Sequence, residues 1–138
     1  MTMIVLSSST IEIIRDQDVI LFRNRVKEMA DKIGMSLVNQ TKLITAASEL
    51  VRNMLRYANG GKILLEIISR NNISGVRLTF DDKGPGIPDI KLAMQDGYTT
   101  GKTLGMGLPG AKRLVNEFDI KSEVGKGTCV TIIRWKNA

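Results

Sequence analysis

The chain has 138 residues, of which 43% are hydrophobic and 25% charged, and these values are typical of one globular domain. Twenty Lys and Arg against fourteen Asp and Glu give a net charge of +6, but the basic residues are dispersed and aromatic residues make up only 4%, which disfavours a nucleic-acid-binding surface. The chain has no histidine and one cysteine, which excludes a Ser-His-Asp triad, a structural zinc site and a phosphate-accepting histidine.

The N-terminal part is expected to form two short strands and then a helix. Residues 4–8 and 11–14 have strand composition and predict an edge pair. From 19 to 33, apolar residues recur at helical spacing. Asp16 or Asp18 is expected to cap the start of this helix, and the glycine that follows it to end it.

A second, longer helix is expected up to residue 58. Ser36 is a suitable N-cap, and the pair Gly60-Gly61 is expected to end the helix. Its apolar residues lie on one stripe, as a helix packed on a sheet requires: Leu43, Ala47, Leu50, Met54 and Ala58.

The rest of the chain is expected to contain four strands and two short helices. The first strand pair is joined by a tight turn at Asn71-Asn72. The expected strands are 62–69, 73–82, 119–123 and 128–135, the helices are 89–94 and 106–116, and 96–104 is expected to be a mobile loop. The strands come in neighbouring pairs without regular βαβ alternation, so we expect an α+β fold: a two-layer α/β sandwich whose mixed, mostly antiparallel sheet is covered by helices on one face.

The segment DDKGPGIPDI follows a predicted strand and is richer in glycine and proline than a turn requires. Alternation along the strand places Asp82 on the inner side and Asp81 toward solvent. Because Gly84 and Gly86 have no Cβ, a flat ligand would be able to lie against the backbone beside the Asp82 carboxylate. The alternative is a turn in which this aspartate bonds its own backbone, and the segment alone does not decide between the two.

The long helix carries a second polar feature. Glu49 and Asn53 are four residues apart, so they lie on one line at the edge of the apolar stripe. A carboxylate base beside an amide oxygen is what a site needs to deprotonate a nucleophile and to contribute one ligand to Mg²⁺. A half-exposed polar edge without a function is the alternative reading of this pair alone.

Two glycine-rich segments resemble phosphate-binding motifs but lack their context. Residues 97–103 have one residue too few for a P-loop, and Gly105 to Gly110 match a dinucleotide fingerprint without the preceding strand. Glycines that lead into a helix nevertheless expose N–H groups to phosphate oxygens, and Lys102 would add a positive charge there.

In this order, the motifs resemble those of the GHKL ATP-binding superfamily, which includes gyrase, a heat-shock chaperone, histidine kinases and a mismatch-repair ATPase. The matching segments are Glu49 to Asn53 (E-x-x-x-N), Asp82 to Gly86 (D-x-G-x-G), Leu104 to Leu108 (the second glycine box) and Gly125 to Thr128 (G-x-G-T). Within the superfamily, the whole length of 1–138 resembles a single domain of the small bacterial switch kinases of the anti-sigma-factor type.

The resemblance implies a role for each matching position. Asp82 would bind the adenine amino group of ATP with help from Thr128, directly or through water, with Gly84 and Gly86 beside it. Asn53 would coordinate Mg²⁺, and Glu49 would be the general base toward a serine or threonine hydroxyl of a protein substrate. The phosphates would be held by the second glycine box and its neighbour in the preceding loop: Lys102, Gly105, Met106, Gly107 and Leu108.

The resemblance also implies partners and alternatives. The expected activity is serine/threonine phosphorylation of small STAS-domain regulators in a partner-switching stress pathway, together with activation of a phosphatase by binding. The alternatives are an anti-sigma factor that sequesters a sigma subunit and a nucleotide-gated binding protein with little kinase activity. We expect no signal peptide, membrane segment or nucleic-acid partner, and a cytoplasmic location, which suits the single Cys129.

Overall fold

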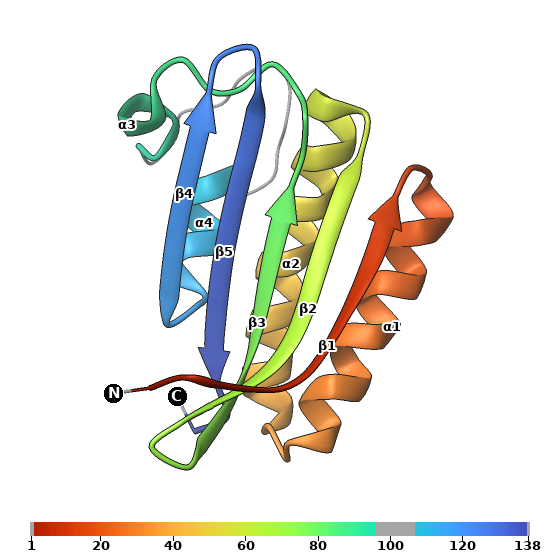
Figure 1. Ribbon diagram of the computed structural model, residues 1–138, viewed down its shortest axis with the longest axis vertical. Helices are drawn as coiled ribbons and strands as arrows, with labels where there is room; N and C mark the ends of the chain where they lie inside the picture. Colours follow the sequence, from red (N-terminus) through yellow and green to blue (C-terminus); the bar gives the residue numbers. More distant parts are fainter. Residues whose placement is uncertain (1, 96–106, 138) are drawn as a thin grey trace.

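The computed structural model describes residues 2–95 and 107–137, which form one five-stranded sheet with helices on one of its faces (Figure 1). The sheet order is β1-β2-β3-β5-β4, and every pairing is antiparallel. The strands are β1 (Ile4–Ile13), β2 (Gly61–Arg70), β3 (Ile73–Asp81), β4 (Glu117–Glu123) and β5 (Gly127–Trp135), and the helices are α1 (Asp16–Lys32), α2 (Leu37–Ala58), α3 (Ile90–Ala93) and α4 (Gly107–Arg113). The α+β fold with a helix-covered sheet is confirmed, and these strands contain no parallel pair.

The N-terminal strand differs from the prediction. Instead of two short strands, β1 is one strand that pairs with β2 along its length, with a register irregularity between Val5 and Ser7. The serine-rich centre of β1 is accommodated at the edge of the sheet, where most of its side chains are exposed. The chain before β1 reaches the open face of the sheet, where the Met3 sulfur lies 3.0 Å from the Arg77 guanidinium.

Helix α1 begins at Asp16, three residues before the apolar periodicity. The Asp18 carboxylate reaches back and accepts hydrogen bonds from the backbone N–H groups of Ile14 and Arg15, both at 2.9 Å. The N-cap is Arg15, so neither predicted aspartate occupies that position; Asp18, at the third helical position, makes the capping contact instead, and these backbone bonds lower its pKa. Gly34 follows the helix with φ of +77°, in the conformation that glycine adopts most easily.

Helix α2 carries two residues of the predicted site, Glu49 and Asn53. Ser36 Oγ accepts a hydrogen bond from the Asn39 N–H at 3.2 Å, so the predicted N-cap is confirmed. The C-cap is Asn59 in a left-handed conformation, with φ of 58°, where the glycine pair had been expected to end the helix. Four members of the predicted apolar stripe are buried in the core: Leu43, Ala47, Leu50 and Met54. The fifth, Ala58, is half-buried.

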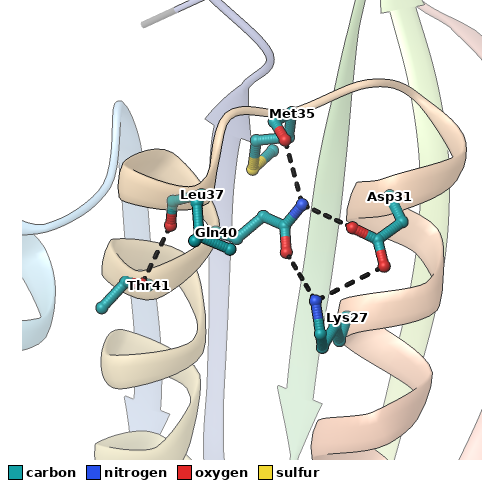
Figure 2. Close-up of polar contacts among 6 residues, drawn as sticks. All are labelled: Lys27, Asp31, Met35, Leu37, Gln40 and Thr41. Atoms are coloured by element: carbon teal, nitrogen blue, oxygen red, sulfur yellow. Dashed lines mark hydrogen bonds and ion pairs between the residues drawn. The ribbon is translucent and has the colours of Figure 1, made fainter.

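A buried amide joins the first two helices (Figure 2). Gln40 of α2 is only 4% exposed and donates to Asp31 Oδ1 at 2.7 Å and to the Met35 carbonyl at 2.9 Å. Its Oε1 accepts from Lys27 Nζ at 3.3 Å. Both ends of the amide are therefore bonded, and the junction holds α1 against α2 with no unsatisfied polar atom on Gln40.

The core lies between the helices and the sheet, and through it α2 packs on β3 and β5. Phe22 of α1 packs edge to face on Phe80 of β3, with ring centroids 5.8 Å apart. Asn71 and Asn72 both have positive φ, so β2 and β3 are joined by the tight turn that the sequence predicted. Across residues 2–95 and 107–137, no helix combines the length and the apolar character that crossing a membrane requires.

Candidate functional site

A cavity of about 380 Å³ opens where the C-terminal half of α2, the segment after β3, the start of α4 and the strand β5 meet. Its walls are mainly apolar, and a few polar side chains converge on it, which is the usual make-up of a small-molecule site. The polar lining residues that the sequence singled out are Asn53, Asp82 and Thr128, and the apolar walls include Leu50, Met54, Phe80, Ile87, Leu92 and Val130.

The Asp82 carboxylate is held at the end of this cavity by two backbone groups. Its Oδ1 accepts from the Gly84 N–H at 2.9 Å and from the Thr128 N–H at 3.1 Å. The bond to Gly84 is the self-bonded turn that we considered as an alternative to a ligand site, and the ligand reading stays a prediction. Among the described residues, both hydrogen bonds that this carboxylate accepts go to Oδ1, which leaves Oδ2 for a ligand. Asp81 is exposed, as the strand alternation predicted.

Glycine is required at positions 84 and 86 for a reason that differs from the one we inferred. A Cβ on Gly84 would lie 2.6 Å from the Ala58 Cβ, and one on Gly86 would collide with the Glu123 carbonyl. Gly86 also has φ of +80°. The space beside these residues is therefore filled by α2 and by the β4–β5 turn, and glycine is needed for packing of this segment on its own protein. Gly86 still lines the cavity, whereas Gly84 does not.

Helix α2 places Glu49 and Asn53 one turn apart, next to the same cavity. Asn53 lines the cavity, while Glu49 is 7% exposed and lies just beyond the lining. Glu49 Oε1 accepts from Arg52 Nη1 at 2.7 Å, and Oε2 accepts from the Gly107 N–H at 3.4 Å. Gly107 itself lines the cavity, so the carboxylate is one hydrogen bond away from it. The polar line on α2 is therefore turned toward the cavity and is not a solvated edge.

The second glycine box is described only in its last part. Gly107, with φ of +63°, and Leu108 both line the cavity. The other residues predicted to hold phosphates lie outside the described residues, as does the loop expected at 96–104: these are Lys102, Gly105 and Met106. The predicted helix at 106–116 is described as the shorter α4, Gly107–Arg113.

Two residues of the site were missed in the sequence. Arg52 forms an ion pair with Glu49, three residues before it on α2. This spacing is common on helix surfaces, so the sequence contained no signal that Arg52 belongs to the site. Ser122 of β4 bonds Thr128 Oγ1 at 2.8 Å and accepts from the Ile87 N–H at 2.8 Å. Strand alternation would have put Ser122 and Thr128 on one face, but the pairing of β4 with β5 in this register was needed to bring them together.

Comparisons with known proteins agree with this geometry. Residues 38–138 match the model of the histidine kinase-, DNA gyrase B- and HSP90-like ATPases. The chain is 39% identical over 127 residues to the serine/threonine-protein kinase RsbT of Bacillus subtilis (strain 168), and the match covers 92% of this chain and 96% of RsbT. It is 31% identical over 118 residues to the anti-sigma F factor of Thermoanaerobacter sp. (strain X514), covering 82% of each chain.

A solved structure shows the same fold. The crystal structure of the RsbU and RsbW domains of a Mycobacterium tuberculosis protein superposes with a TM-score of 0.63 at 22% identity, covering 93% of this chain and 31% of that longer one. The matched family model includes both the α2 motif and the cavity segments, and it confirms the resemblance that the four motifs indicated. The chain belongs to the family of histidine kinase-, DNA gyrase B- and HSP90-like ATPases.

Proposed function

We propose that this protein is a serine/threonine kinase of a partner-switching pathway, one domain over its whole length, that transfers the γ-phosphate of ATP to small STAS-domain regulator proteins. The observation that carries the proposal is that Asn53 and Asp82, 29 positions apart in the sequence, line one cavity with Glu49 beside it. Similarity to a serine/threonine kinase over 92% of the chain supports the reaction type.

Asp82 and the apolar walls are assigned to the adenine. The free Oδ2 would accept a hydrogen bond from the exocyclic amino group, while Oδ1 remains bound to the backbone. The purine ring would be buried among the side chains of Met54, Phe80 and Ile87. An amino group is a donor, so the carboxylate would favour adenine over a purine with an oxygen at that position.

Asn53 and the glycine box are assigned to the triphosphate. An amide oxygen suits Mg²⁺, which usually takes one or two protein ligands together with phosphates and water, so Asn53 fits as the protein ligand of the ion. The ion would neutralise phosphate charge. Gly107 and Leu108, which line the cavity, would face the phosphates together with Lys102, Gly105 and Met106 of the preceding segment.

Glu49 is assigned as the general base. It would take the proton from the substrate serine or threonine hydroxyl as that oxygen bonds to the γ-phosphorus, while the bond from phosphorus to the β–γ bridging oxygen breaks and ADP leaves. The contact of Glu49 Oε2 with the Gly107 N–H places the carboxylate next to the glycine box. Phosphoryl transfer asks a protein mainly for positioning and charge neutralisation, and these residues supply both.

One of the proposed partners is suggested by a relative. An anti-sigma F factor is 31% identical to this chain, so binding of a sigma subunit is the second candidate function, and a serine phosphatase activated by binding is a further proposed partner. We place the protein in the cytoplasm, where ATP is available. A nucleotide-gated binder without kinase activity would need Asn53 and Asp82 but no base, and the buried Glu49 favours catalysis.

The test is phosphotransfer from γ-labelled ATP with Mg²⁺ to candidate STAS proteins of the same organism. We expect label on serine or threonine of one of them with the native protein, and labelling at least about 100-fold slower with the Glu49→Ala variant. A matched control is Glu28→Ala, which removes an exposed glutamate of α1 and should leave transfer unchanged. ATP binding without transfer to any STAS protein, combined with stable capture of a sigma subunit, would replace the kinase with the anti-sigma function.

A further inference from the structure

Ser122 lies at the junction of three parts of the candidate site. It is paired with Thr128 across β4 and β5, and the next pair on the same face, Ile120 with Val130, packs in or against the core. Ser122 and Thr128 therefore point to the helix-covered side, where Thr128 lines the cavity. Through the Ile87 N–H, Ser122 also holds the segment that follows Gly86.

The hydroxyl group of Ser122 has three polar neighbours and only one proton to donate. The Ile87 N–H donates to Ser122 Oγ at 2.8 Å, the Gly127 carbonyl lies 3.1 Å away, and Thr128 Oγ1 lies 2.8 Å away. A carbonyl can only accept, so all three contacts are hydrogen bonds only when Ser122 donates to Gly127 and accepts from Thr128. The opposite choice would leave two oxygens, Ser122 Oγ and Gly127 O, facing each other without a proton.

This arrangement determines what Thr128 offers to a ligand. Its hydroxyl proton is directed to Ser122 and away from the cavity, so Thr128 Oγ1 presents only lone pairs there. Asp82 Oδ2, held in place because Oδ1 accepts from the Thr128 N–H, is the second acceptor at the same end of the cavity. Two acceptors on residues that line the same cavity suit a group with two N–H donors.

We propose that Ser122 is a positioning residue for nucleobase recognition: it directs the Thr128 hydroxyl proton out of the cavity, so that Thr128 and Asp82 together accept from the exocyclic amino group of adenine. The inference rests on the proposed nucleotide site and names a residue through which that site selects its base. It also assigns the bond to the Ile87 N–H a role, because the same serine keeps the cavity wall at Ile87 in register with Thr128.

The experiment compares two ligands that differ only in this amino group. Isothermal titration calorimetry of the full chain with Mg²⁺ gives Kd for ATP and for purine riboside triphosphate, which has hydrogen in place of the amino group. For the native protein we expect ATP to bind about 10 to 100 times more tightly, the range for hydrogen bonds to charged acceptors. In Ser122→Ala this preference should fall at least about threefold, because Kd for ATP rises more than Kd for the analogue.

The ratio separates positioning from a general structural effect. If Ser122→Ala only loosened the cavity wall, both ligands would weaken equally and the ratio would stay the same, which would overturn the inference. Unchanged affinity for both ligands would overturn it as well. Thr131→Ala is the matched control, since it removes a hydroxyl from the opposite face of β5 and should change neither Kd.

Two further measurements keep the result interpretable. If circular dichroism shows that Ser122→Ala does not fold, Ser122→Cys takes its place, because it nearly keeps the size of the side chain and loses the strong hydrogen bonds. This variant must show the same fall in the preference for ATP over the analogue. An unchanged preference would contradict the inference. Failure of the native protein to bind ATP, or equal native affinity for the two ligands, would instead overturn the adenine site itself. The two failures are therefore distinct.

Discussion

Glu49 and Arg52 form an ion pair of 2.7 Å on α2, with the Glu49 side chain 10% exposed and the Arg52 side chain 56% exposed. The arginine occupies Oε1 from the solvent side, and Oε2 is turned toward Gly107 at the cavity. The pair therefore fixes which oxygen of the carboxylate faces the proposed phosphate site. Because the Arg52 side chain is more than half exposed, we expect the pair to contribute little to stability and its effect to be seen in the reaction.

The first prediction concerns the two partners of this pair. Glu49→Ala should lower the rate of phosphotransfer at least about 100-fold, the usual contribution of a general base, while Kd for ATP changes less than about threefold. Arg52→Ala should lower the rate by a smaller factor, because the base remains but is less well oriented. Single-turnover transfer and calorimetry check both, and equal rates for Glu49→Ala and the native protein would refute the assignment of the base.

The second prediction compares two glycines that have nearly the same backbone angle φ. Gly86 has φ of +80° and Gly125 has φ of +83°, so alanine is strained at both positions. At Gly125 an added Cβ would meet nothing within 4 Å, whereas at Gly86 it would collide with the Glu123 carbonyl. Gly125→Ala should cost about 1 kcal/mol in the free energy of unfolding, and Gly86→Ala at least about 1 kcal/mol more.

Urea denaturation measures the difference between these two variants, and ATP titration of each shows whether the cavity has changed. Gly86→Ala should also weaken ATP binding because Gly86 lines the cavity, and Gly125→Ala should not. Equal losses of stability would mean that the segment after Asp82 moves away from the β4–β5 turn without cost, contrary to the tight packing described above.

Local signals in the sequence were sufficient for much of the fold and for part of the site. Ser36 begins α2 because a hydroxyl at an N-cap satisfies a free N–H, and Asn71-Asn72 turns the chain because both residues tolerate positive φ. The motif residues Asn53 and Asp82 were predicted to share a ligand, and the structure brings them to one cavity.

What could not be predicted depends on contacts between distant segments. Arg134 is 6% exposed and donates to the Leu114 carbonyl at 2.8 Å and to Asn39 Oδ1 at 2.7 Å, although an arginine in a strand is expected at the surface. The role of Ser122 could not be predicted, because it depends on the register in which β4 pairs with β5. The continuity of β1 through its serine-rich centre likewise depends on a contact between distant segments, its pairing with β2.

The third prediction concerns the junction of α1 and α2 in Figure 2. Gln40→Ala removes the amide from a 4% exposed position and leaves the Met35 carbonyl without its donor, so the free energy of unfolding should fall by about 1 to 3 kcal/mol. Thr41→Ala is the neighbouring control: its hydroxyl donates to the Leu37 carbonyl at an exposed position, and its loss should cost less than about 0.5 kcal/mol. Similar losses in urea denaturation would show that the buried junction does not hold the helices.

The fourth prediction is a pH dependence at the same junction. The pKa of Asp31 is held below its ordinary value, first by the hydrogen bond from Gln40 and then by the charge of Lys27. Because the folded pKa is lower than the unfolded one, this stabilisation is present above the unfolded pKa of about 4 and is lost as the pH falls through the folded pKa. Asp31→Asn should therefore flatten the fall of unfolding free energy between about pH 5 and pH 3, and an unchanged slope would contradict the lowered pKa.

The most direct test of the account is the affinity for ATP of two variants at neighbouring positions. Asp82→Asn places an amide at the cavity, whereas Asp81→Asn makes the same change on the exposed side of the strand end. Calorimetry with Mg²⁺ should show at least about a 30-fold rise in Kd for Asp82→Asn, and less than a twofold change for Asp81→Asn. Native affinity in Asp82→Asn, or equal losses in both variants, would show that Asp82 does not bind the adenine of the nucleotide.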